Sequence, residues 1–152
     1  MPRVSIVMGS TSDDPAAQEV VQVLEQLGID YEVRAISAHR SPERLRQYVD
    51  EASGRGVEVF VGLAGGAAAL PGALASWTTL PVIGVPLASS ELKGMDALMA
   101  IAQMPPGVPV GCMAIGSWGA RNAAYMAASI LGIKYEGIKQ AYEEYRRRLS
   151  EG

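Results

Sequence analysis

The chain has 152 residues, a formal net charge of -3 and a hydrophobic content of 49%. At roughly 100–200 residues per domain, this length predicts one domain over 1–152 with a core of its own. The sequence holds one histidine and one cysteine, which excludes an intrachain disulfide and a zinc site built from several such residues. The acidic balance argues against a nucleic-acid partner, and no apolar run reaches the roughly 18 residues of a membrane span. We therefore expect a cytoplasmic protein that binds neither nucleic acid nor membranes.

The basic residues form one cluster, Arg146–Arg148, near the C-terminal end of the chain. Glu143 and Glu144 precede it, so that Glu143 stands at i,i+4 from Arg147 and Glu144 from Arg148. This spacing is typical of ion pairs on a solvated helix face. We expect the cluster to face solvent in these pairs.

Short apolar runs alternate with stretches whose apolar residues recur at helical spacing. In chain order, these patterns predict a strand at 4–8, a helix at 14–27, a strand at 31–36, a helix at 42–53, a strand at 57–63, a helix at 71–77, a strand at 81–85, a helix at 96–104, a strand at 108–115 and helices at 120–131 and 135–149. Strands that alternate with helices are typical of a parallel, doubly wound sheet. The predicted fold is therefore an α/β domain with a parallel, doubly wound sheet of five strands. Its core lies at 3–131, and a C-terminal helix follows at about 135–149.

Open parallel sheets bind ligands at the carboxyl ends of their strands. The loops that follow the predicted strands are 9–14, 36–42, 64–72, 86–94 and 115–121. We expect the functional residues to lie in these loops.

Gly9, Ser10, Ser12 and Asp13 lie between the first predicted strand and the first predicted helix. Backbone N–H groups at a helix N-terminus, with short hydroxyl side chains beside them, suit a phosphate group. The acidic side chain of Asp13 suits ribose hydroxyls. The alternative is an ordinary N-cap turn, because Ser and Asp are common capping residues.

The residues that follow the second predicted strand are Ser37, Ala38, His39 and Arg40. Imidazole ordinarily titrates near neutral pH, which makes His39 the candidate general acid and base. Arg40 offers a planar pair of donors to phosphate or carboxylate, the alternative being a surface ion pair with Glu43 or Asp14. A Cys–His nucleophile pair would require Cys112, which lies in a predicted strand, where a free cysteine usually packs as a small apolar residue.

The segment 64–72 follows the third predicted strand and has almost no polar side chain. Its candidate site residues are Ala64, Gly65, Gly66, Ala67 and Leu70. Such a segment offers backbone amides and a close approach to a ligand, and it offers no acid or base. Tight packing of a helix on the sheet is the alternative interpretation.

Six motifs occur in order along the chain. They are Met8-Gly9-Ser10-x-Ser12-Asp13, Ser37-Ala38-His39-Arg40-x-Pro42, Ala64-Gly65-Gly66-Ala67-Ala68-x-Leu70-Pro71-Gly72, Pro81-Val82-Ile83-Gly84-Val85-Pro86, Gln103-Met104-Pro105-x-Gly107-Val108-Pro109-Val110 and Ala114-Ile115-Gly116-x-x-Gly119-Ala120-x-Asn122-Ala123-Ala124. Together they resemble the family of N5-carboxyaminoimidazole ribonucleotide mutases, the catalytic subunit of phosphoribosylaminoimidazole carboxylase (the PurE family). The resemblance covers about 4–131, and six co-linear motifs make it specific.

This resemblance implies a three-layer, flavodoxin-like (Rossmann-like) fold in a homo-octamer, with active sites at subunit boundaries. It also implies conversion of N5-carboxyaminoimidazole ribonucleotide to 4-carboxyaminoimidazole ribonucleotide in purine biosynthesis, without a metal or organic cofactor. In the family pattern, Ser10, Ser12 and Arg40 would hold the phosphate. Asp13 would bind ribose hydroxyls, and His39 would transfer the proton.

The sequence departs from the family at Ala69, where mutases normally have a histidine before Leu-Pro-Gly. A sister class carboxylates aminoimidazole ribonucleotide directly with CO2 and also lacks that histidine. That class usually has Arg-Ser-Asn where this chain has Gly66-Ala67-Ala68, so we favour the mutase and keep direct carboxylation as the alternative. The loop 64–68 would hold CO2 in a dry pocket. A non-catalytic nucleotide-binding module is a third hypothesis, which depends on the phosphate-type loop alone.

Assembly is a separate expectation. Trp77, Trp118 and the helical run 123–126 are apolar residues that we expect to be exposed in an isolated chain. Exposed apolar surface of this kind favours a homo-oligomer.

Overall fold

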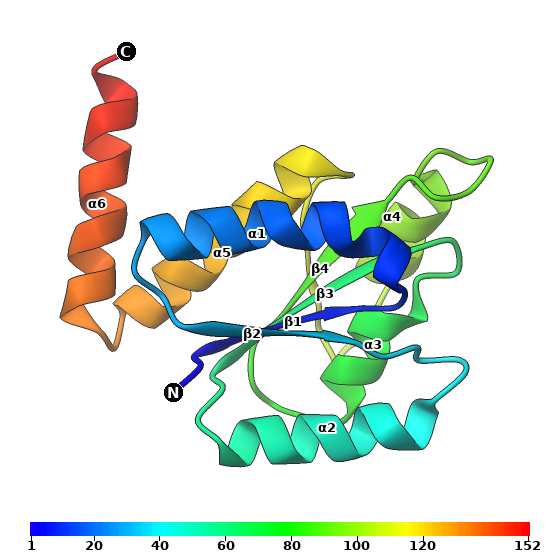
Figure 1. The fold of residues 1–152 in the computed structure, drawn as a ribbon. Helices are drawn as coiled ribbons and strands as arrows, with labels where there is room; N and C mark the ends of the chain where they lie inside the picture. The colour runs from blue at the N-terminus through cyan, green and yellow to red at the C-terminus, as the bar shows by residue number, and fades with distance from the viewer.

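A computed structural model describes residues 1–152 and contains five parallel strands between two layers of helices (Figure 1). The strands are β1 (Val4–Met8), β2 (Tyr31–Ala35), β3 (Val59–Gly65), β4 (Val82–Leu87) and β5 (Gly111–Cys112), in the sheet order β2-β1-β3-β4-β5. The helices are the single-turn η1 (Thr11–Asp13), α1 (Asp14–Gln26), α2 (Pro42–Gly54), α3 (Ala69–Ser76), α4 (Met95–Ala102), α5 (Ser117–Gly132) and α6 (Glu136–Ser150). The α/β, flavodoxin-like fold predicted from the sequence is confirmed.

The two faces of the sheet bury separate cores. Helices α1 and α5 cover one face, where Leu24 of α1 is fully buried. Helices α2, α3 and α4 cover the other face, where Leu45 of α2 is fully buried. Ile6 and Val7 of β1 point to opposite cores, as successive side chains of a strand do. Because both faces are covered, β3 and β4 are continuous apolar runs, and β1 has one polar residue, the buried Ser5.

The parallel register places the carboxyl ends of neighbouring strands side by side. Met8 of β1 pairs with Ala35 of β2 and with Leu63 of β3. Gly65 of β3 pairs with Leu87 of β4. The loops after these four strands therefore gather at one edge of the sheet, at the right-hand end of Figure 1 and far from α6.

The fifth strand is much shorter than the predicted strand at 108–115. Only Gly111 and Cys112 form the ladder with β4, and the Met113 N–H adds a 2.8 Å hydrogen bond to a β4 carbonyl. Pro109 lies just before this ladder and has no N–H to donate to it. The other predicted strands and helices begin and end within about three residues of the observed bounds.

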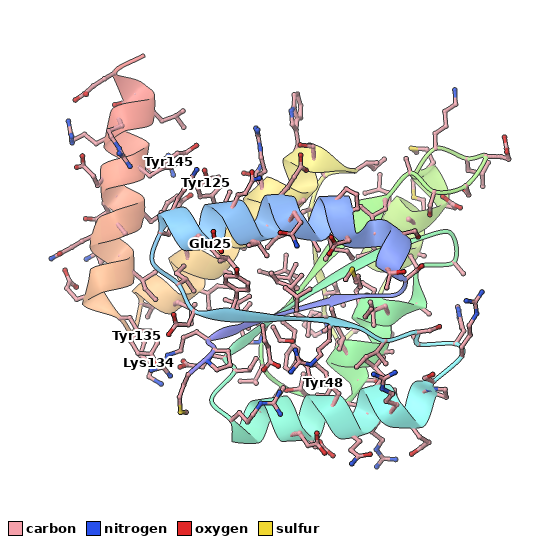
Figure 2. All side chains as sticks on the ribbon, in the orientation of Figure 1. Glu25, Tyr48, Tyr125, Lys134, Tyr135 and Tyr145 are labelled. Atoms are coloured by element: carbon pink, nitrogen blue, oxygen red, sulfur yellow. The ribbon has the colours of Figure 1, made fainter.

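Helix α6 stands apart from the two helical layers and is attached by aromatic stacking (Figures 1 and 2). Tyr125 of α5 stacks on Tyr142 and Tyr145 of α6, with ring centroids 5.7 and 4.6 Å apart. Burial raises the pKa of Tyr125 above its ordinary value. The stacked rings give α6 its main contact with the body of the domain.

Glu58 fastens the connection between α5 and α6. Arg3 donates to Glu58 over 2.9 Å, Lys134 donates over 3.3 Å, and the Tyr135 hydroxyl donates as well. Burial opposes ionisation of Glu58, but the hydrogen bonds from Tyr135 and Lys134 outweigh it and lower the pKa of the carboxyl. Because Glu58 directly precedes β3, this cluster joins the start of the central strand to the base of α6.

The predicted pairing of Glu143 with Arg147 and of Glu144 with Arg148 is wrong. Arg147 instead binds Glu144 and Glu151, each over 2.5 Å. Residues at i,i+3 are also neighbours on a helix surface, and one guanidinium fork can reach carboxylates on both sides of it. The charges still lie on an exposed face of α6.

The apolar surface differs in part from the expectation. Ala123 and Ala124 are fully buried, because this side of α5 packs on α1 and the sheet. Trp77 is half-buried, whereas Trp118 is 74% exposed and Met126 is 43% exposed. None of the helices combines the length and the apolar character that crossing a bilayer requires.

Gly119 of α5 has no room for a side chain. A Cβ at this position would lie 1.6 Å from the carbonyl oxygen of Ala114. We expect Gly119→Ala to lower the free energy of unfolding by about 1–3 kcal/mol, the usual cost of overpacking, as measured by urea unfolding.

Gly54→Ala is the matched control, because a Cβ at Gly54 of α2 would meet nothing within 4 Å. This variant should keep the wild-type stability or exceed it slightly, since alanine is the better helix former. Equal stability of the two variants would contradict a fixed contact at Ala114.

Candidate functional site

A cavity of about 300 Å³ opens at the carboxyl edge of the sheet. It is bounded by the loops after β1, β2, β3 and β4 and by the first turn of α3. Its lining consists of Gly9, Ser10, Ser12, Asp13, Ser37, Ala38, His39, Arg40, Ala64, Gly65, Ala67, Ala68, Ala69, Leu70 and Ser89. The structure therefore brings together every site residue predicted from the sequence except Gly66.

A larger hollow of about 1010 Å³ lies beside the amino end of β4. Its lining includes Trp77, Val108 and Met126, and its charged side chains are those of Arg46 and Asp50. It contains no histidine, since the one imidazole of the chain lines the smaller cavity.

The wall after β1 is a turn held by hydroxyl groups. The backbone of Ser10 is extended, with φ -152, and its Oγ accepts a hydrogen bond from the Ser12 N–H over 3.3 Å. The Ser12 hydroxyl donates to the same oxygen over 3.0 Å. This confirms the capping role of Ser10. The Ser12 and Asp13 N–H groups are bonded to Ser10, so this wall offers an anion the serine hydroxyls and the positive end of the α1 dipole.

Asp13 is a half-buried carboxyl at the junction of η1 and α1. Burial raises the pKa of Asp13 above its ordinary value, while a hydrogen bond with the backbone of Ser10 opposes that shift. A carboxylate with reduced access to water is a strong acceptor for hydroxyl donors. This environment fits the ribose-binding role predicted for it.

The wall after β2 carries the imidazole and the guanidinium. The Arg40 N–H donates to Ser37 Oγ over 3.1 Å, which tightens the turn before α2. His39 and Arg40 are exposed on the rim of the cavity. Arg40 forms no ion pair with Glu43 or Asp14, so the surface-pair alternative is wrong. Its donors remain available to a ligand.

The wall after β3 offers backbone groups and no polar side chain. Gly66 has φ +61 and Ala68 has φ +47, so the chain turns through the left-handed region twice. The Ala68 N–H donates to the Gly65 carbonyl over 3.1 Å, and α3 then begins at Ala69. A left-handed alanine costs about 1–2 kcal/mol and persists where the surrounding structure enforces it. Gly66 makes this turn without lining the cavity.

Sequence reasoning missed three lining residues, Ala68, Ala69 and Ser89. The two alanines lie inside the segment 64–72, but they carry no chemical group that would single them out. Ser89 lies in the loop 86–94, which was expected at this edge. A hydroxyl side chain soon after the strand β4, which neighbours β3, was the sequence signal that could have identified it.

Cys112 does not line the cavity. It packs beside the core under α2, α3 and α4, and burial raises the pKa of its thiol. Its Sγ donates to the Met113 carbonyl over 3.4 Å. The chain therefore forms no Cys112–His39 pair, and no group of three His, Cys, Asp or Glu side chains is placed to hold a metal ion.

Known proteins match the chain over nearly its whole length. Residues 3–152 match the family model described as AIR carboxylase. The chain belongs to the AIR carboxylase family. A Thermotoga maritima protein named N5-carboxyaminoimidazole ribonucleotide mutase is 53% identical to it, over 98% of this chain and 86% of its own length. A Pyrococcus abyssi protein of the same name is also 53% identical, over 98% of this chain and 84% of its own length.

A solved structure of the family has the same fold. The crystal structure of Treponema denticola PurE matches with a TM-score of 0.90 and 26% sequence identity, covering 99% of this chain and 93% of that one. The family resemblance predicted from the six sequence motifs is thus confirmed. The AIR carboxylase domain of this chain extends through α6, beyond the motifs.

The raised pKa of Asp13 implies that the free energy of unfolding depends on pH. Because this pKa is higher in the folded chain than in the unfolded chain, ionisation of Asp13 opposes folding. The cost is present at neutral pH and is lost as the pH falls below the ordinary Asp value of about 3.9. We expect Asp13→Asn to raise the free energy of unfolding at pH 7, and the gain to disappear near pH 3, in urea titrations.

Asp14→Asn is the control for this effect. Asp14 is in the first turn of α1, where a negative charge favours the helix dipole, so its neutralisation should not raise stability. A lower stability of Asp13→Asn than of the wild type at pH 7 would refute the unfavourable burial of Asp13.

Proposed function

We propose that the chain is an N5-carboxyaminoimidazole ribonucleotide mutase of purine biosynthesis, which forms 4-carboxyaminoimidazole ribonucleotide. The observation that carries the proposal is the 53% identity, over 98% of the chain, to relatives of that name. The cavity supports it, because it joins an anion-binding turn, one imidazole and a loop of backbone amides.

The walls after β1 and β2 hold the ribonucleotide. The hydroxyls of Ser10 and Ser12 and the free guanidinium of Arg40 bind the phosphate. Asp13 accepts hydrogen bonds from the ribose hydroxyls. Gly9, Ser37 and Ala38 complete this part of the lining.

The wall after β3 surrounds the reacting carboxyl group. Between Ala64 and Leu70 it has no side chain that exchanges protons, and its amides suit a carboxylate. Its apolar side chains exclude water and limit the escape of CO2 between the two bond changes.

The reaction is redox-neutral, and the substrate gains and loses one proton in the course of it. The exocyclic N–C bond of the carbamate breaks, CO2 is released, and the nitrogen takes up a proton. Carbon 4 of the imidazole then attacks the same CO2, and the tetrahedral adduct loses its ring proton. His39 supplies the first proton and removes the second, so it is regenerated in each turnover.

Direct carboxylation of aminoimidazole ribonucleotide with CO2 is the second candidate. It is favoured by Ala69, which stands where the mutase class has a histidine. The names of the relatives and the sequence Gly66-Ala67-Ala68 favour the mutase. Both reactions give the same product.

The source of CO2 separates the two reactions. Purified protein given N5-carboxyaminoimidazole ribonucleotide should form product without added bicarbonate, because the substrate carries its own carboxyl group. Chromatography of the nucleotides with and without bicarbonate measures this. Product formation that depends on bicarbonate, with aminoimidazole ribonucleotide as the saturable substrate, would establish direct carboxylation instead.

His39→Asn is the control that separates an enzyme from a binding module. Asparagine is polar but cannot exchange the proton, so turnover should fall by about 10²–10⁴-fold. Nucleotide affinity, measured by calorimetry, should stay near that of the wild type. Persistent turnover in the variant would contradict the role of His39. A wild-type protein that binds the nucleotide but shows no turnover would favour the non-catalytic module.

We also propose that the chain forms a homo-oligomer in the cytoplasm, with an octamer implied by the family resemblance. Trp118 is 74% exposed, Met126 is 43% exposed, and the larger hollow beside Trp77 is partly apolar. Such surface favours association. Light scattering should give the mass of about eight chains, whereas a monomer would contradict assembly. Cell fractionation tests the location.

A further inference from the structure

The polar side chains of the cavity are unevenly distributed among its walls. Those after β1 and β2 are Ser10, Ser12, Asp13, Ser37, His39 and Arg40. The wall after β3 contributes glycine, alanine and leucine alone, and beyond it the loop after β4 contributes one hydroxyl, that of Ser89. Because the sheet order is β2-β1-β3-β4, the wall after β3 lies between Ser89 and the turn after β1. Two strand spacings, about 10 Å, separate β1 from β4.

Ser89 lies tightly against the end of β3. A Cβ added at Gly65 would lie 1.6 Å from Ser89 Oγ and 2.9 Å from Ser89 Cβ. The hydroxyl therefore occupies the space that any side chain at position 65 would need. The glycine is what lets this hydroxyl reach the backbone of the cavity wall.

The loop after β4 is held by the neighbours of Ser89. Ser90 donates to Asp96 Oδ2 over 2.6 Å and accepts from the Leu92 N–H over 3.1 Å. Lys93, at φ +55, donates its N–H to the Ser90 carbonyl over 3.1 Å. The Ser89 hydroxyl takes no part in these bonds. Ser89 itself is exposed at the cavity, and its hydroxyl has a free donor.

We propose that Ser89 is a further substrate-binding residue, whose hydroxyl donates a hydrogen bond to the migrating carboxyl group of the substrate. This proposal rests on the mutase function proposed above, which assigns the phosphate and the ribose to the walls after β1 and β2. The group that reaches Ser89 is therefore at the other end of the nucleotide. There the carboxylate is the acceptor, and Ser89 is the one side-chain donor on that side of the cavity.

Two nucleotides that differ only by the carboxyl group test this contact. Ser89→Ala should bind 4-carboxyaminoimidazole ribonucleotide about tenfold more weakly, because a hydrogen bond to a charged group is lost. It should bind aminoimidazole ribonucleotide, which lacks the carboxyl group, as tightly as the wild type does. Arg40→Met is the contrasting variant and should weaken both nucleotides alike. Calorimetry on the wild type and the two variants gives the six affinities.

Gly65→Ala tests the same contact from the other side, because its Cβ displaces the Ser89 hydroxyl. It should weaken the carboxylated nucleotide selectively, and the Gly65→Ala, Ser89→Ala double variant should lose no more selectivity than Ser89→Ala alone. No weakening by Ser89→Ala, or equal weakening of both nucleotides, would overturn the proposal. If Ser89→Ala lost affinity for the carboxylated nucleotide selectively while the wild type showed no turnover, the contact would be established and the mutase reaction contradicted.

Discussion

The parallel register of β2, β1, β3 and β4 is the constraint on which the candidate site depends. Helices cover both faces of the sheet, so Ile6 and Val7 of β1 are buried in opposite cores. A slip of one residue would exchange these faces and expose each side chain to the wrong layer. The register is therefore fixed by burial along the whole sheet. It brings His39, which follows β2, and Gly65, the last residue of β3, to one cavity.

Four loops converge at one edge of the sheet and leave little space between their backbones. The chain has small residues where the backbones come closest. Gly65 admits the hydroxyl of Ser89, and Gly119 admits the carbonyl of Ala114. Where backbones come this close, there is no room for acidic or basic side chains. The charged side chains of the cavity consequently lie on the walls after β1 and β2, the loop after β4 adds the hydroxyl of Ser89, and the wall after β3 consists of backbone and apolar groups. This division gives the cavity a charged end and an apolar end, which suits the carboxyl transfer proposed for it.

The parts of this fold that could be predicted from the sequence are those with a local cause. Apolar runs and capping residues are local, so the strands, the helices and the loops after β1, β2 and β3 were predicted nearly as observed. The length of β5 depends on which edge residues find a partner in β4, which no local pattern specifies. Ser89 and Ser90 are adjacent and chemically identical, and they differ only in tertiary contacts. Ser90 is bonded to Asp96, whereas Ser89 faces Gly65.

The single histidine, which together with the single cysteine excludes a zinc site built from several such residues, is sufficient for the proposed reaction because the protons balance. The nitrogen gains one proton and carbon 4 loses one, so a group that donates first can accept afterwards. A second imidazole at position 69 is not needed for that balance. Asp13 has a different task, since its burial makes the free carboxylate costly and its pKa high. Hydroxyl donors from a bound ribose would satisfy that carboxylate, so part of the stability lost in the free chain is regained when substrate binds.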